Sequence, residues 1–191
     1  MDINQLGLRG KYGYINIRKK SLLLKSVLCL SLMAVLLLIG FLIFHNIRNV
    51  LMIPGMLMVI PLANYVASYA AVMKFRSGTE DQYSMLAHFY EQDMLMADLL
   101  FVTEDGKRYL CEFAVIYKGG VVAYASDSSW KPYVVESHVN SLLKKRGVGM
   151  NLKIYHDFDE FLKRINGIEP ASDEDGRRIE LARETIINTC M

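Results

Sequence analysis

Two long apolar runs near the N-terminus constrain this chain more than any other feature. Val27–Phe44 and Val50–Met73 are 18 and 24 residues long and contain no charged residue, and only five residues separate them. About 20 helical residues cross the hydrocarbon core of a bilayer. The runs therefore predict an integral membrane hairpin with helices over about 24–44 and 50–73.

A cleaved signal peptide does not explain the first run. Its basic segment would be about 25 residues long, its apolar segment exceeds the usual range of about 7–15, and no small-residue cleavage site follows. Basic residues flank the outer ends of both runs, whereas the connecting turn carries only Arg48. The flanking residues are Arg18, Lys19, Lys20 and Lys25 before the first run and Lys74 and Arg76 after the second. The positive-inside bias then predicts two spans in the cell membrane with both termini cytoplasmic.

Charge is divided unevenly along the chain. Residues 1–76 carry nine basic residues and one acid, whereas residues 77–191 carry 13 basic and 19 acidic residues. Because phosphate contacts need clustered Lys and Arg, an acidic second part argues against nucleic-acid binding. Residues 1–20 contain Tyr12 and Tyr14 among basic side chains, which favours a cytoplasmic segment in the headgroup zone over a solvated tail.

The second run has features beyond those of a simple anchor. Pro54 and Pro61 each remove a backbone donor, and Asn64 falls near mid-span. Small residues recur every four positions at Ala63, Ala67 and Ala71. This spacing favours close packing of helices, with Asn64 bonding across to the first span, to a second copy or to another membrane protein. Two spans do not enclose a pore, so transport would need an oligomer or partner proteins.

The periodicity after residue 76 predicts one small α+β domain over 77–168. The expected elements are a helix over 79–97, strands over 99–103, 108–117 and 121–126, a helix over 132–146, a strand over 150–155 and a helix from 157 to 167. The order α-β-β-β-α-β-α favours a largely antiparallel sheet with the helices packed on one face. A polar linker over 169–176 precedes a last helix over 177–190, for which docking, partner binding and fraying stay open.

Alternation in the second strand predicts which side chains share a face. The positions expected on one face are Tyr109, Cys111, Phe113, Val115 and Tyr117. Cys111, Cys29 and Cys190 have no CxxC partner and no His at ligand spacing, which favours reduced thiols over a disulfide or zinc. The sequence indicates no cofactor.

Three carboxylates and a lysine form the one candidate catalytic set. Asp98 or Asp105 precedes Glu112-Phe113-Ala114, and Lys118 follows further along the strand. With the α-β-β-β-α-β order, this arrangement resembles the core of the PD-(D/E)xK nuclease superfamily, including its NERD-type and Mrr-type domains. The resemblance implies a divalent metal held by the acids and a lysine that assists the attacking water. Ala114 occupies the position of the family's lysine, so the resemblance implies a degenerate relative with Lys118 as substitute.

Other polar clusters are weaker candidates. The loop containing Asp127, Trp130 and Lys131 has the composition of a recognition loop, although a structural role for Trp130 is favoured. His88 and Glu91 have metal-ligand spacing on a helix, but a solvated polar face is favoured. His138 and His156 are isolated.

Together these patterns predict a membrane-anchored cytoplasmic interaction or regulatory domain without catalytic activity of its own. The layout resembles that of many bacterial membrane proteins that place a two-helix hairpin before a small cytoplasmic α/β domain. Two alternatives stay open: a membrane-tethered, degenerate PD-(D/E)xK-type nuclease, and an accessory subunit of a membrane transport or secretion complex.

Overall fold

A computed structural model describes residues 8–44, 52–90, 94–103, 105–168 and 176–190. The chain divides into two compact units, a hairpin unit formed by residues 15–76 and a domain unit formed by residues 1–14 and 77–191. The turn between the two apolar runs and most of the polar linker lie outside the described residues.

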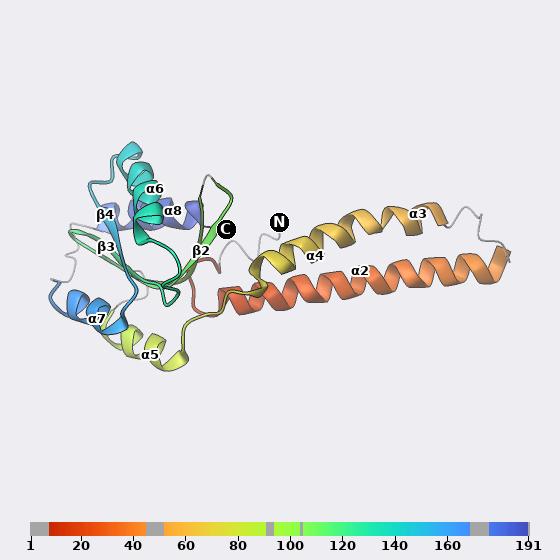
Figure 1. Ribbon diagram of the computed structural model, residues 1–191, viewed down its shortest axis with the longest axis horizontal. Helices are drawn as coiled ribbons and strands as arrows, with labels where there is room; N and C mark the ends of the chain where they lie inside the picture. Colours follow the sequence, from red (N-terminus) through yellow and green to blue (C-terminus); the bar gives the residue numbers. More distant parts are fainter. Residues whose placement is uncertain (1–7, 45–51, 91–93, 104, 169–175, 191) are drawn as a thin grey trace. The chain divides into compact units, whose positions relative to one another are not determined.

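The hairpin unit consists of the helices α2 (Tyr14–Phe44), α3 (Met52–Leu57) and α4 (Val59–Met73) (Figure 1). Two segments, Tyr14–Ile43 and Ile53–Met73, are long and apolar enough to cross a membrane. The first helix begins ten residues before the predicted start, so residues 15–20 are helical and do not form a separate segment. At 31 residues α2 extends for about 46 Å, which exceeds the thickness of a hydrocarbon core.

The second half of the hairpin is interrupted where its prolines predict a disturbance. Helix α3 ends at Leu57 and α4 begins at Val59, with Met58 between them. Pro61 has no N–H to donate to the carbonyl of Leu57, four residues earlier, so the regular bonding pattern is lost at that position. The flanking bonds persist, because Met58 N donates to Pro54 O at 3.2 Å and Leu62 N donates to Met58 O at 3.2 Å.

The domain unit has the predicted α-β-β-β-α-β-α order followed by a C-terminal helix. Its elements are α5 (Glu80–Phe89), β1 (Leu95–Val102), β2 (Arg108–Tyr117), β3 (Gly120–Tyr124), α6 (Pro132–Lys145), β4 (Asn151–Tyr155), α7 (Phe158–Asn166) and α8 (Gly176–Thr189). The sheet has the order β1-β2-β3-β4, with antiparallel pairing except between β3 and β4, which are parallel. This confirms the predicted α+β fold.

Helices cover both faces of the sheet, so the expectation of a single covered face was wrong. Helices α6 and α8 lie on one face of the sheet, and α5 and α7 lie on the other (Figure 1). Every residue from Leu110 to Ile116 in β2 is buried. A strand covered on both faces reads as a continuous apolar run, which hides the alternation expected of a half-exposed sheet.

The first helix of the domain is shorter than predicted. Helix α5 ends at Phe89, and β1 begins at Leu95, four residues before the strand expected at Leu99. Met94 and Ala97 continue the helical spacing of the preceding apolar residues, but Ala97 is a strand residue paired with Phe113. The apolar residues of the buried strand β1 thus continued the spacing of α5, which made the helix look longer in the sequence than it is.

The predicted face of β2 is divided between the two cores. Tyr109 and Cys111 pack with the α6/α8 core, whereas Phe113, Val115 and Tyr117 pack with the α5/α7 core. The change occurs around Glu112, opposite Asp98 of β1, whose φ is +55°. A left-handed residue within a strand interrupts the regular alternation of side chains. The alternation in β2 changes at the same place, because the β1–β2 register is the same on either side of Asp98.

Candidate functional site

Two buried carboxylates face each other at the centre of the β1–β2 ladder. The neighbouring register pairs are Ala97 with Phe113 and Leu99 with Cys111, which places Asp98 opposite Glu112. Asp98 is 2% exposed and Glu112 is 6% exposed. Of the predicted catalytic set, this is the pair of acids that the fold brings together.

Serine residues bind both carboxylates. Ser77 Oγ donates to Asp98 Oδ2 at 2.7 Å. The backbone N–H of Ser126 donates to Glu112 Oε2 at 3.0 Å, and its hydroxyl donates to Oε1. Burial raises the pKa of Glu112 above its usual value, the bonds from Ser126 oppose that rise, and the charge of Asp98 adds to it. The acids therefore lie in a closed, hydrogen-bonded environment.

Two chain segments that border the hairpin unit lie over the acid pair. A Cβ on Gly78 would stand 3.3 Å from the Cβ of Glu112 and 2.4 Å from the ring of Phe113, so this position has no room for a side chain. Tyr12 donates from its hydroxyl to Gly78 O at 3.0 Å, and its ring stacks on Tyr83 at 4.4 Å. The structure thus groups residues 8–14 with the domain unit and does not make them a segment of their own.

The surroundings of Tyr12 also raise the pKa of its side chain. Burial raises the pKa of its phenol, and the negative charges of Glu80, Asp98 and Asp81 raise it further. Sequence reasoning missed this role because Tyr12 is separated from its partners by the whole hairpin, and a tyrosine among basic residues is typical of a membrane surface.

The other two members of the predicted catalytic set lie elsewhere. Lys118 follows the end of β2, six residues beyond Glu112, which corresponds to about 20 Å of extended strand. Asp105 lies at the opposite end of β2, where it lines an open polar hollow of about 290 Å³ with His138 and Ser141 of α6. The geometry therefore supplies two acids without the lysine that the nuclease mechanism requires near them.

We expect Glu112→Gln to remove a pH-dependent cost to stability. Because burial raises the pKa of Glu112, the folded domain binds its proton more tightly than the unfolded chain does. The contribution of Glu112 to stability is then largest below its ordinary pKa of 4.5, and it is lost as the pH rises through the folded-state pKa. Unfolding of the full chain in mild detergent, followed by Trp130 fluorescence between pH 4 and about 8, should show a smaller decline for the variant.

Glu180→Gln is the matched control for this measurement, because Glu180 is exposed on α8. It should leave the pH dependence of the wild type unchanged. Parallel stability curves for the wild type and Glu112→Gln would contradict the assignment of a raised pKa to Glu112.

The candidate recognition loop is held against the domain. The ring of Trp130 packs on Tyr109 at 4.8 Å and on His156 at 5.1 Å, joining the α6/α8 core. The ring nitrogens of His156 contact Ala125 O at 2.8 Å and Trp130 O at 3.1 Å. Trp130 therefore has the structural role that the sequence favoured, and His156, which seemed isolated, connects β3, the loop and β4.

The polar ends of the same loop have different surroundings. Asp127 Oδ1 accepts a bond from Ser129 N at 2.9 Å, which closes a turn. Lys131 is exposed and directly precedes α6. The polar groups of the loop thus lie at the surface, whereas its aromatic side chain, Trp130, already packs on Tyr109 and His156.

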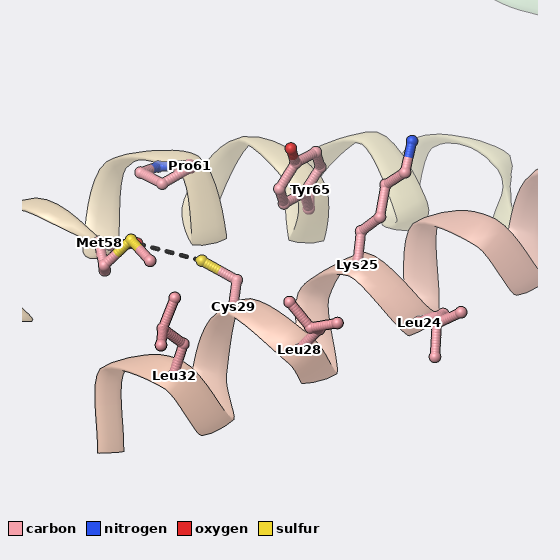
Figure 2. A pocket seen from close by; sticks show the side chains of 8 residues that line it. All are labelled: Leu24, Lys25, Leu28, Cys29, Leu32, Met58, Pro61 and Tyr65. Atoms are coloured by element: carbon pink, nitrogen blue, oxygen red, sulfur yellow. Dashed lines mark hydrogen bonds between the residues drawn. The ribbon is translucent and has the colours of Figure 1, made fainter. Parts of the chain in front are cut away.

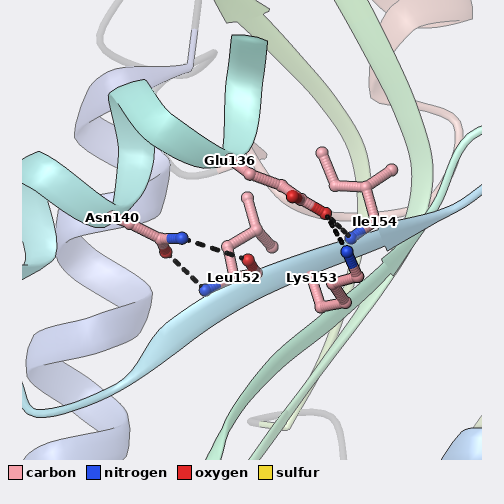
Figure 3. A network of polar contacts seen from close by, with 5 residues as sticks. All are labelled: Glu136, Asn140, Leu152, Lys153 and Ile154. Atoms are coloured by element: carbon pink, nitrogen blue, oxygen red, sulfur yellow. Dashed lines mark hydrogen bonds and ion pairs between the residues drawn. The ribbon is translucent and has the colours of Figure 1, made fainter. Parts of the chain in front are cut away.

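Both edges of the sheet are covered. At β4, Asn140 of α6 accepts from Leu152 N at 2.6 Å and donates to Leu152 O at 3.3 Å, and Glu136 accepts from Ile154 N at 2.8 Å (Figure 3). Glu136 also pairs with Lys153 at 3.4 Å. Side chains here replace the strand partner that an open edge would attract.

The β1 edge is covered by backbone from the two ends of the chain. Ala97 N donates to Gly10 O at 2.8 Å, and Phe101 forms an isolated bridge with Cys190. Helix α8 therefore docks on the domain, where Ile179, Ala182 and Ile186 are buried. With both edges occupied along these positions, recognition by strand addition has no open template there.

The remaining metal and thiol candidates do not form a site among the described residues. His88 stands edge-on to Phe89 with ring centroids 5.4 Å apart, and Glu91 lies outside the described residues. In the described ranges, no three His, Cys, Asp or Glu side chains gather at metal-binding distance. Burial raises the pKa of the Cys111 and Cys190 thiols, which are therefore protonated at neutral pH.

Comparisons with protein-family models, with curated proteins and with solved structures find no match to this chain. The likeness to the PD-(D/E)xK core therefore stays a prediction from residue pattern and element order.

Proposed function

We propose that this protein is a membrane-anchored interaction or regulatory domain that acts by binding and has no catalytic activity of its own. The observation that carries the proposal is the apolar surface of the hairpin unit. In the most apolar 18-residue stretch of each helix, only 11% of the first and 6% of the second is buried inside the protein. Side chains such as Leu42 and Ile60, 67% and 69% exposed, need an apolar surrounding that a bilayer provides.

The proposed orientation places both termini and the acidic domain in the cytoplasm. Arg18, Lys19 and Lys20 lie on the first turns of α2, and Lys74 and Arg76 follow the end of α4. Basic residues at the outer ends of both helices favour that side for the loops they border. The bilayer is then the first partner of the chain.

The exposed face of α4 supports self-association as the second interaction. Ala63, Asn64 and Ala67 are exposed, whereas Tyr65 and Tyr69, which lie on the other side of the helix from Ala67, are partly buried. An amide facing lipid at mid-span lacks the partners that water would offer, and the adjacent alanines permit close approach of another helix. A second copy offers a matching Asn64 and a matching small surface.

Crosslinking of the full chain in membranes tests this proposal. We expect Ala67→Cys to form a disulfide-linked dimer under mild oxidation, with the wild type and Tyr69→Cys as controls for the native thiols and for the opposite face. Adding Asn64→Ala should lower the dimer yield about threefold to tenfold, since an interhelical hydrogen bond in a membrane contributes about 0.6–1.4 kcal/mol. Equal crosslinking from Ala67→Cys and Tyr69→Cys would contradict a specific face.

The facing acids support a second candidate, a membrane-tethered and degenerate PD-(D/E)xK-type nuclease. Asp98 and Glu112 are opposite each other on adjacent strands, as the resemblance requires of its acids. Ala114 in the lysine position and the distance of Lys118 along the strand speak for the first candidate, because the fold alone does not carry the activity. Divalent-metal-dependent DNA cleavage that disappears in Glu112→Gln would favour the nuclease.

A further inference from the structure

An apolar groove with one basic end runs between α2 and α4 of the hairpin unit (Figure 2). Its volume is about 370 Å³. Leu28 and Leu32 of α2 form one wall, and Met58 and Pro61 form the other. Cys29 Sγ donates to Met58 O at 3.6 Å, which links the two helices at this level.

The polar groups of the groove are concentrated away from its apolar end. Figure 2 shows Lys25 at one end, Leu32, Met58 and Pro61 toward the other, and Tyr65 between them. The ammonium of Lys25 is a positive charge with three hydrogen-bond donors, and the phenol of Tyr65 adds a fourth. The groove therefore has the amphipathic layout of a phospholipid: a place for a phosphate and an adjoining place for a hydrocarbon chain.

The position of Lys25 in the sequence matches this layout. Lys25 is the last charged residue before the uncharged stretch of α2, and Arg18, Lys19 and Lys20 lie one to two turns before it. A lysine at such a boundary lies at headgroup depth, where anionic lipids of the inner leaflet are attracted. From Lys25 to Leu32 the helix rises about 10 Å, so the apolar end of the groove extends into the hydrocarbon region.

We propose that this groove binds one anionic phospholipid, with the phosphate at Lys25 and Tyr65 and an acyl chain along Leu28, Leu32 and Pro61. The proposal rests on the membrane anchoring proposed above and adds a specific ligand to it. A bound lipid would also fill the space between the helices that Met58 and Pro61 line. Complementary charge favours an anionic lipid over a second copy of the chain, whose first turns are equally basic.

Native mass spectrometry of the full chain in mild detergent tests the proposal. The purified, delipidated protein is titrated with dioleoyl phosphatidylglycerol or dioleoyl phosphatidylcholine. We expect one phosphatidylglycerol to be retained in preference to phosphatidylcholine. Lys25→Gln should weaken that retention about fivefold, since a basic residue near the membrane surface contributes about 1 kcal/mol.

Two matched variants make the outcome specific. Lys20→Gln removes the same charge outside the groove and should retain the lipid as the wild type does, whereas Leu28→Trp should fill the groove and abolish selective retention. Inorganic phosphate should not displace the lipid, because the acyl chain contributes to binding. Equal losses in Lys20→Gln and Lys25→Gln, displacement by phosphate, or a protein dimer in place of the lipid adduct would overturn the proposal.

Membrane anchoring is measured separately. Resistance of the protein to alkaline extraction from membranes does not depend on lipid selectivity. A chain that resists extraction but retains both lipids equally would overturn the lipid site and leave the proposed anchoring intact.

Discussion

Val66→Arg should move the domain unit to the opposite side of the membrane in a large fraction of molecules. Val66 lies near the middle of the second span and is 50% exposed. An arginine at mid-span costs about 2.5–3.5 kcal/mol of insertion free energy, or about a hundredfold in the insertion equilibrium. This span already contains two prolines, Asn64 and two tyrosines, so it has less reserve than the first.

Cysteine labelling in intact cells measures this change of side. In the otherwise unchanged chain, a membrane-impermeant maleimide should label Asn46→Cys from outside but not Ser128→Cys, which lies on the exposed loop before α6. Val66→Arg should make Ser128→Cys accessible, because failure of the second span leaves one span with the C-terminus outside. Val66→Leu is the matched control and should leave Ser128→Cys protected.

The reverse labelling pattern in the unchanged chain would contradict the orientation itself. Labelling that is identical in Val66→Arg and Val66→Leu would instead show that the second span tolerates the charge. The native cysteines add little background, since Cys29 lies within the first apolar run and Cys111 and Cys190 are buried.

Local chemistry allowed the elements around tight turns to be predicted well. The Asp105-Gly106 turn and Arg108–Tyr117 were predicted at their observed positions, because positive φ at Gly106 and the paired strands are encoded within a few residues. Pro132 and Gly147 likewise bracket α6, with Pro132 in its first turn and Gly147 in a left-handed conformation after its end.

Features that depend on distant residues could not be predicted from local pattern. Covering both faces of the sheet removed the alternation that would have shown where α5 ends and β1 begins. The residues around Asp98 do not predict its positive φ, because Asp98 lies within a buried strand and not in a turn. The pairing of Tyr12 with Gly78 and Tyr83 joins segments separated by the hairpin. The sequence could predict that Asp98 lies opposite Glu112 only if the register between β1 and β2 was known.

Phe113→Ala should lower the free energy of unfolding of the domain by about 3–5 kcal/mol. The ring is fully buried, and its centroid lies 6.5 Å from those of both Tyr83 and Tyr124. It supports the backbone of Gly78, the point at which the chain enters the domain from the hairpin unit. Denaturant unfolding of the full chain in mild detergent, followed by Trp130 fluorescence, measures the loss, and Phe89→Ala is the control because Phe89 is 70% exposed.

A double-mutant cycle separates the support of Gly78 from general loss of packing. Gly78→Ala alone would bring a methyl group to 2.4 Å from the Phe113 ring and should cost about 1–3 kcal/mol. Combined with Phe113→Leu, which shortens the opposing side chain, Gly78→Ala should cost less than it does alone. Strictly additive effects would mean that the ring and the backbone at residue 78 are energetically independent. Coupling would instead mean that the ring of Phe113 and the backbone at Gly78 hold each other in place within the domain unit.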